Sequence, residues 1–367
     1  VTLTDLQKKT FYDAYVINDC GAGEVSAPLG PLKFETYWTN DVGISKVVTP
    51  ISGCDLGVET LTILMSNYGS APQSLVPFTF TVNGQEVGVP QPDDGFYTGV
   101  LGKDSSEMIE FETTYDFSAP GEYVIQVFTQ MGGDEDFSND TVTYYLVGRQ
   151  LVPYTQDFEN WSGGWTVDTA SQNATWEFGT PSKTLLTGAA SGVNAWATSL
   201  TGLYNDNEKS YLNSPCFDFS DLNEDPVIEF SLFFETEMNW DGLALELSVD
   251  GGETWEKVGA VGEGVNWYNF FNTTTLMLGD VWAGTSPGWI NARHGLFGTA
   301  GESDVRLRFS FASDGSGNFY DGIGIDDIHI FVPLANNLGA SAIQTSGADI
   351  ECGVAEDEVT FSFTNIG

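Results

Sequence analysis

The chain has 367 residues and carries 52 acidic against 12 basic side chains, a formal net charge of −40 at pH 7. A surface with this charge repels nucleic-acid phosphates and anionic membranes, so we expect neither nucleic-acid binding nor membrane insertion. Hydrophobic residues make up 41% of the chain and glycine contributes 42 residues, which favours a β protein with many turns over long amphipathic helices.

The histidine and cysteine content argues against several kinds of metal and catalytic site. Only two histidines are present, which argues against a His-cluster metal site and against His-based catalysis. The four cysteines, Cys20, Cys54, Cys216 and Cys352, lack the CxxC spacing of zinc and redox motifs, and the sequence leaves their pairing open. No apolar run approaches the roughly 18 residues of a membrane-spanning helix.

Residues 1–42 show the weakest pattern in the chain. Leu32 to Trp38 is expected to form a strand, and Leu6 to Tyr15 is a weak candidate for a helix. We interpret this segment as the tail of a preceding domain or a linker.

Residues 43–148 are expected to form an Ig-like sandwich, because alternating segments are separated by turn signals such as Asn83-Gly84 and Pro120-Gly121. Strands are expected at 61–67, 78–84, 107–117, 121–130 and 141–148. The N-x-G that ends the first strand, the APGEY before a long strand and the GDEDFSNDT hairpin resemble CARDB-type adhesion modules of bacterial surface proteins. The resemblance implies a spacer or adhesion role.

The loop from Gly132 to Asp140 gathers several acids. Carboxylates at such spacing could hold Ca²⁺, but the loop lacks the full EF-hand pattern. We favour a solvated turn with side-chain-to-backbone hydrogen bonds.

Residues 151–332 follow a different pattern, which begins after the linker around Val152-Pro153. The module opens with YTQDFENW, continues with SPCFDFS and closes with DGIGIDDIHIF. These motifs, in this order, resemble the MAM-like and cleaved-adhesin jelly rolls of secreted Bacteroidetes-type proteins. The resemblance implies a jelly-roll β-sandwich, an extracellular location and export by a type IX system.

A hairpin inside this module carries the pattern S-x-D-x-G-x-x-W, formed by Ser248, Asp250, Gly252 and Trp255. It resembles the Asp-box, a structural hairpin in which the Asp holds the turn and the Trp packs below it. The motif indicates β structure and says little about chemistry.

The predicted metal site lies where the first and last strands of the jelly roll are expected to be neighbours. This would bring Asp157 and Glu159 near Asp326 and Asp327, and such acids repel one another unless a cation lies between them. The resemblance also implies a structural Ca²⁺ there, with Glu159 and Asp327 as the main side-chain ligands. Asp326 and Asp327 point to opposite faces of a regular strand, so both can be ligands only if the strand bends.

A Trp-rich insertion, Asn266 to Ala292, offers a speculative binding surface. Its large aromatic residues could form a platform for sugar rings, although large aromatics in β modules usually lie in the core. These residues are Trp267, Tyr268, Trp282 and Trp289. In the same insertion GTSPG matches G-x-S-x-G at Ser286, but its Gly/Trp/Pro loop lacks the strand–turn–helix context of a nucleophile.

Residues 335–367 repeat the opening of the Ig-like module. Asn67 and Asn365 occupy equivalent positions, 298 residues apart, each at the end of an alternating strand. We interpret 335–367 as a truncated second Ig-like module. The chain is therefore expected to be a segment of a longer repeat protein whose modules contact neighbouring repeats.

Together these patterns predict an all-β, non-catalytic segment of a large secreted or cell-surface adhesin, not an enzyme. The Ig-like modules would space calcium-stabilised jelly rolls that bind a glycan or a surface polymer. The alternative is an accessory carbohydrate-binding region of a secreted hydrolase.

Overall fold

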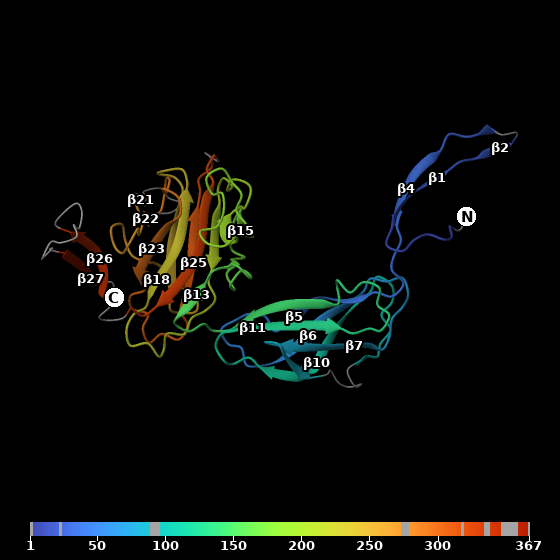
Figure 1. The fold of residues 1–367 in the computed structure, drawn as a ribbon, viewed down its shortest axis with the longest axis horizontal. Helices are drawn as coiled ribbons and strands as arrows, with labels where there is room; N and C mark the ends of the chain where they lie inside the picture. Colours follow the sequence, from blue (N-terminus) through green and yellow to red (C-terminus); the bar gives the residue numbers. More distant parts are fainter. Residues whose placement is uncertain are drawn as a thin grey trace, which may run out of the picture. The chain divides into compact units, whose positions relative to one another are not determined.

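The computed structural model describes residues 3–21, 24–88, 96–272, 279–316, 319–333, 338–345 and 359–365. In these ranges every regular element is a β-strand, so the predicted all-β class is confirmed (Figure 1). The chain divides into two compact units, Val1–Gly148 and Arg149–Gly367, and each sheet is built within one of them. None of the described residues forms a helix long and apolar enough to cross a membrane.

The first unit contains an Ig-like sandwich of two antiparallel sheets. One sheet has the order β10–β6–β5, with β5 at Val42–Thr49, β6 at Val58–Asn67 and β10 at Ser106–Asp116. The other has the order β12–β11–β7–β8, with β7 at Val76–Val82, β8 at Gln85–Gly88, β11 at Glu122–Thr129 and β12 at Thr141–Val147. A short strand, β9 at Phe96–Tyr97, pairs with β7.

Alternation explains how these sheets face each other. In β6 the side chains of Leu61, Ile63 and Met65 are buried, and rings from the second sheet meet them in one core. Phe78 and Phe111, from opposite sheets, pack edge to face with ring centroids 5.2 Å apart.

The predicted hairpin at Asn83-Gly84 is also confirmed. Asn83 has φ of 50° and Gly84 has φ of 75°, which is the left-handed backbone that a two-residue hairpin turn requires. Val82 and Gln85 pair directly across this turn.

The acidic loop 132–140 adopts the favoured hydrogen-bonded turn. Asp134 Oδ1 accepts from the backbone N–H of Asp136 at 2.8 Å, and Asp136 Oδ1 accepts from that of Ser138 at 3.1 Å. Asp134 Oδ2 also accepts from the N–H of Val42 at 2.9 Å, so this buried carboxylate ties the loop to β5.

The segment before the sandwich forms a ribbon in which β1, Phe11–Val16, pairs with β4, Leu29–Glu35. At its far end β2, Asp19–Gly21, pairs with β3, Glu24–Val25. The weak helix expected from Leu6 to Tyr15 was wrong, because the aromatic and β-branched residues of FYDAYV favour a strand and pair with β4.

The second unit is a jelly-roll sandwich of two larger antiparallel sheets. The first has the order β15–β16–β25–β18–β23, with β13 also pairing with β25. Its strands are β13 (Tyr154–Gln156), β15 (Trp176–Gly179), β16 (Ala195–Thr198), β18 (Val227–Glu235), β23 (Ile290–Gly295) and β25 (Gly322–Phe331). The second has the order β14–β17–β24–β19–β20. Its strands are β14 (Thr166–Val167), β17 (Lys209–Asn213), β19 (Gly242–Ser248), β20 (Glu256–Lys257) and β24 (Arg306–Ala312).

The chain passes repeatedly from one of these sheets to the other, and aromatic side chains fill the space between them. Trp165 stacks on Phe309 with ring centroids 5.5 Å apart, and Phe230 packs edge to face on Phe309 at 5.0 Å. All three side chains are buried. A separate pair, β21 at Phe270–Asn272 and β22 at Gly279–Val281, lies within the Trp-rich insertion.

The last described pair, β26 at Leu338–Thr345 and β27 at Val359–Asn365, repeats the pairing of β5 with β6. Leu338 is opposite Asn365, as Val42 is opposite Asn67. The register then shifts between Ala340 and Ala342 in one pair and between Ile44 and Lys46 in the other. The two pairs thus share this feature of register, and the internal repeat inferred from sequence stays a prediction.

We predict that limited proteolysis of the full chain will cut first between residues 148 and 154 and leave two resistant fragments. The reason is that each unit has its own hydrophobic core, so a cut in the chain between them leaves both cores intact. Mass spectrometry of the fragments provides the readout. Early cleavage inside either sandwich would contradict the division into two units.

Candidate functional site

The first and last strands of the jelly roll are neighbours, as the sequence predicts. Tyr154 in β13 lies opposite Ile330 in β25, and Gln156 lies opposite Ile328. The acids that follow β13 and those within β25 are thus brought to one region of the first sheet.

A β-bulge in β25 bends the strand at the two consecutive aspartates. The pairing with β18 shifts register between Glu229 and Ser231, and Asp327 has φ of 48°. As a result both carboxylates contact Ser191. The N–H of Ser191 donates to Asp326 Oδ2 at 3.2 Å, and its hydroxyl donates to Asp327 Oδ1 at 2.7 Å.

The same loop, residues 190–194, also holds Glu159. Its carboxylate accepts from the backbone N–H groups of Val193 and Asn194, both at 2.9 Å from Oε1. Gly192 between them has φ of 54°, and a Cβ there would lie 2.1 Å from the carboxylate carbon of Glu159, so a larger residue would be strained and would displace this carboxylate. Three of the four predicted ligands thus contact one short loop, but their carboxylate oxygens do not all lie within 4.8 Å of one another.

Asp157 is placed differently from the other three. It is exposed, and its Oδ1 accepts from the N–H of Glu159 at 3.1 Å in a local turn. No contact of Asp157 with Asp326 or Asp327 is among the hydrogen bonds of the described residues.

Burial makes Asp326 the electrostatically unusual member of this group. Its side chain is 0% exposed, and burial raises its pKa to about 6, with a further rise from the charge of Asp327. Backbone N–H groups of Ala190 and Ser191 oppose this rise. The donor set, hard carboxylate oxygens without a Lys or Arg partner among the described residues, fits Ca²⁺ in ligand type.

A second acidic group, which the sequence analysis missed, comprises Glu237, Asp241 and Asp314. One carboxylate oxygen from each lies within 4.8 Å of the others, the one such group found among the described residues. Gly242 of β19 pairs with Ala312 of β24, so the acids just outside these strands come together at one end of the second sheet. This signal appears only once the strand register is known.

The carboxylate of Asp241 is the centre of this second group. It is 1% exposed and accepts from Tyr204 Oη at 2.6 Å and from the N–H of Asp314 at 2.9 Å. Burial raises its pKa to about 6, and the charges of Asp314 and Glu237 add to the rise. Oε2 of Glu237 is buried without a hydrogen-bond donor, so this group also has oxygen atoms available to a hard cation.

The aromatic residues nominated as a sugar platform are mostly core residues, which corrects that prediction. Trp267, Tyr268 and Trp282 are 2%, 4% and 0% exposed, and they pack against one another and against Phe230. The insertion places these rings between the two sheets, because burying their large apolar surface area stabilises the fold. Trp289 is half-buried over Phe233 and donates from Nε1 to the carbonyl of Gly188.

Ser286, in the G-x-S-x-G match, takes part in strand-like pairing. It is 5% exposed, its Oγ accepts from the N–H of Phe234 at 3.1 Å, and its own N–H donates to the carbonyl of Phe234. These bonds give the side chain a structural role.

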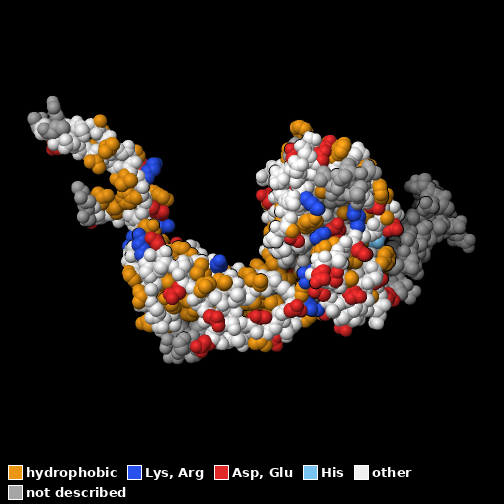
Figure 2. Space-filling model, turned by 180° about the vertical axis from the view of Figure 1, so that it is seen from behind, with side chains coloured by type: hydrophobic (Ala, Val, Ile, Leu, Met, Phe, Trp, Pro, Cys, Tyr) orange, Lys and Arg blue, Asp and Glu red, His pale blue; other side chains and the backbone are white. Residues whose placement is uncertain are grey.

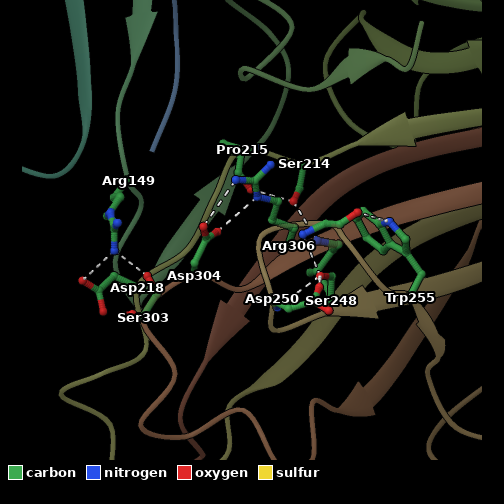
Figure 3. Close-up of polar contacts among 12 residues, drawn as sticks. Arg149, Ser214, Pro215, Asp218, Ser248, Asp250, Trp255, Ser303, Asp304 and Arg306 are labelled. Atoms are coloured by element: carbon green, nitrogen blue, oxygen red, sulfur yellow. Dashed lines mark hydrogen bonds and ion pairs between the residues drawn. The ribbon is translucent and has the colours of Figure 1, made fainter. Parts of the chain in front are cut away.

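The Asp-box hairpin joins β19 to β20 and has the hydrogen bonds that the motif requires (Figure 3). The hydroxyl of Ser248 accepts from the N–H of Gly252 at 2.8 Å and bonds to Asp250 Oδ1 at 2.7 Å. Asp250 Oδ1 accepts from the N–H of Thr254 at 2.9 Å, and the hydroxyl and N–H of Thr254 lower the pKa of Asp250. Trp255 donates from Nε1 to the carbonyl of Gly252 at 3.0 Å and is half-buried.

Comparison with known proteins found no matching family model and no matching curated protein. Among solved structures, the CARDB domain of PF1109 from Pyrococcus furiosus aligns over 30% of this chain and 96% of its own, at 13% identity and a TM-score of 0.25. The K1 cleaved adhesin domain of Lys-gingipain from Porphyromonas gingivalis W83 aligns over 48% of this chain and 96% of its own, at 17% identity and a TM-score of 0.29. A carbohydrate-binding module of the β-sandwich superfamily aligns over 80% of this chain and 99% of its own, at 13% identity and a TM-score of 0.29. At these TM-scores the likeness carries no argument about function, which has to come from the chain's own residues.

Proposed function

We propose that the chain is a non-catalytic segment of a secreted or cell-surface adhesin, in which an Ig-like module spaces a jelly-roll module that binds a glycan or surface polymer. The observation that carries the proposal is the serial arrangement of two sandwiches, each with its own core. The proposal assigns binding to the jelly roll and spacing to the Ig-like sandwich.

Two features support an extracellular location. Cys54 and Cys216 are disulfide-bonded, and disulfides form and persist mainly in oxidising compartments. The net charge of −40 keeps a protein soluble and suits salty surroundings, where self-repulsion is screened over roughly 10 Å. The shared register of β5–β6 and β26–β27 supports neighbouring repeats as further partners.

A glycan array tests the binding proposal. Labelled full chain should bind a subset of glycans saturably, and the signal should be competed by the same glycan in solution. Arrays at 0.15 M and 0.5 M NaCl provide the control, because binding by hydrogen bonds and ring contacts persists when long-range charge is screened. Absence of any saturable signal, or signal that the higher salt abolishes, would contradict the proposal.

As part of this function we propose that Ca²⁺ stabilises the jelly roll at Glu159, Asp326 and Asp327. What supports it is that all three carboxylates contact loop 190–194 and that the pKa of Asp326 is raised. A cation beside them would favour their charged forms.

We predict that millimolar Ca²⁺ will raise the melting temperature of the full chain relative to EGTA by several degrees. Extracellular calcium modules bind with dissociation constants of roughly 0.1–1 mM, and at ten times that concentration linkage contributes about 1.4 kcal/mol. The double variant Glu159→Gln/Asp327→Asn should lose the shift, whereas Asp157→Asn should keep it.

The second acidic group provides the matched control for this experiment. Glu237→Gln/Asp314→Asn removes two carboxylates of the Asp241 group. If this variant loses the shift and Glu159→Gln/Asp327→Asn keeps it, the ion belongs to the Asp241 group and the proposed ligands are wrong. No shift in the unmodified chain would contradict calcium stabilisation altogether.

A further inference from the structure

The outer face of the sheet β14–β17–β24–β19–β20 carries polar and aromatic side chains in an ordered arrangement. Alternation sends Leu212, Leu245 and Phe309 into the core, so their neighbours along the strands face outward. Figure 2 shows several Lys and Arg side chains on the surface of this unit, viewed from behind the face that Figure 1 presents.

Four outward side chains form one row across four strands. Asn213 of β17 pairs with Arg308 of β24, Arg308 pairs with Glu246 of β19, and Glu246 pairs with Lys257 of β20. Neighbouring strands lie about 4.8 Å apart, so the row is about 14 Å long. This length accommodates several consecutive sugar residues.

Arg308 is held between two aromatic rings at the middle of the row. Its guanidinium carbon lies 4.2 Å from the ring centroid of Tyr211 and 4.1 Å from that of Trp255, and its Nε donates to Glu246 Oε2 at 2.6 Å. The guanidinium covers one face of each ring, and the half-buried rings keep part of their remaining surface in solvent. Contacts on three sides preorganise these groups, which reduces the entropy lost when a ligand binds.

Counted together with Asp168, which contacts Asn213, the charges of the row balance although the chain as a whole is strongly acidic. Arg308 and Lys257 are cationic, Glu246 is anionic, and Asn213 donates to the carboxylate of Asp168 at 2.8 Å. A charged polysaccharide gains little from such a balanced row, and a polyanion is repelled by the net charge of −40. A neutral polysaccharide has hydroxyls that both donate and accept, and apolar ring faces that pack on aromatic side chains.

We infer that this row, together with Tyr211 and Trp255, is a binding platform for a neutral polysaccharide. The inference rests on the proposed function of the jelly roll as a binding module and assigns that function a surface and a ligand class. The proposed binding surface is therefore this row of solvent-accessible side chains and not the buried rings of the Trp-rich insertion.

Native affinity electrophoresis of the full chain provides the test. The gels contain konjac glucomannan, barley β-glucan, xyloglucan or arabinoxylan as neutral probes, and polygalacturonate or dextran sulfate as charged probes. At least one neutral probe should retard the chain, and the charged probes should not. Retardation by the charged probes alone, or by no probe, would overturn the inference.

Variants at the centre of the row locate the binding. Tyr211→Ala should weaken binding at least tenfold, whereas Tyr211→Phe keeps the ring and should restore most of the binding that Tyr211→Ala loses. Arg308→Lys keeps the charge but loses the planar guanidinium, and should also weaken binding about tenfold. Tyr15→Ala removes an exposed tyrosine of β1 and serves as the control that leaves binding unchanged.

Circular dichroism and thermal melts show whether each variant is folded. If Tyr211→Ala does not fold, the milder variant Arg308→Lys still tests the platform. If the array shows glycan binding but Tyr211→Ala and Arg308→Lys bind as tightly as the unmodified chain, the platform is wrong and the proposed function stands. If neither the array nor the gels show glycan binding, both are wrong.

Discussion

Replacing Trp282 by alanine is expected to lower the free energy of unfolding of the second unit by about 3–5 kcal/mol. Trp282 is 0% exposed. Its ring centroid lies 4.4 Å from the ring centroid of Tyr268 and 4.9 Å from that of Trp267. The change removes a large apolar area from the core, leaves a cavity between these rings and removes the donor to the carbonyl of Asn266.

Trp240 offers a matched control in the same unit. It is 48% exposed, so Trp240→Ala should change the free energy of unfolding by less than about 0.5 kcal/mol. Differential scanning calorimetry of the full chain separates the transitions of the two units. A loss below about 1 kcal/mol for Trp282→Ala, or equal losses for the two variants, would contradict the core placement of the insertion.

The second large effect is a loss of stability of the jelly roll as pH rises from about 4 to about 6 in the presence of EGTA. Burial raises the pKa of Asp326 and of Asp241 to about 6, above their value of 3.8 in an unfolded chain. Between these values the folded state binds more protons than the unfolded state, so the free energy of unfolding falls with rising pH. For each residue the loss is at most about 3 kcal/mol.

Other acids act in a lower pH range. The pKa values of Asp168 and Asp225 are lowered, mainly by backbone hydrogen bonds, so the stability they provide is lost only as pH falls below about 4. The range from pH 4 to 6 is therefore dominated by groups with raised pKa values, which include the buried Glu208.

Asp326→Asn isolates one contribution to the pH dependence. The amide oxygen keeps an acceptor for the N–H groups of Ala190 and Ser191 but carries no titrating proton. Thermal melts of the full chain at closely spaced pH values in EGTA should show a shallower dependence for this variant. An unchanged slope, or stability that rises from pH 4 to 6 in the unmodified chain, would contradict the argument.

Local patterns in the sequence predict most of the strands. Approximate alternation in β6, β7 and β11 indicates each strand and its buried face, because a half-exposed strand has that period. The turn at Asn83-Gly84 follows from residue chemistry alone. The ribbon of β1 and β4 was less predictable, because its strands are held by mutual pairing and not by a buried face.

The acidic sites show where sequence reasoning stops. The resemblance to jelly-roll modules implies that β13 and β25 are neighbours, which would bring Glu159 toward Asp327. The loop 190–194 that receives these carboxylates has no pattern of its own. The Asp241 group and the row through Arg308 depend on the register of β24 with its neighbours, which long-range pairing decides.

The aromatic insertion failed as a predicted binding surface for a related reason. The sequence shows that Trp267 and Trp282 have large aromatic side chains. It does not predict whether the insertion places these side chains in the core or on the surface. In the structure β22 leads directly into Trp282, whose backbone bonds to that of Leu243 beside the second sheet, and this pairing directs the ring into the core.

The central claim, binding without turnover, is tested most directly by incubating the full chain with the glycan it binds best on the array and recording the mass of that glycan over time. The account predicts that the glycan is retained by the protein and is released with its mass unchanged. Cleaved products that accumulate with the protein, and that disappear on changing Ser286 or one of the buried aspartates to alanine in a folded variant, would contradict it.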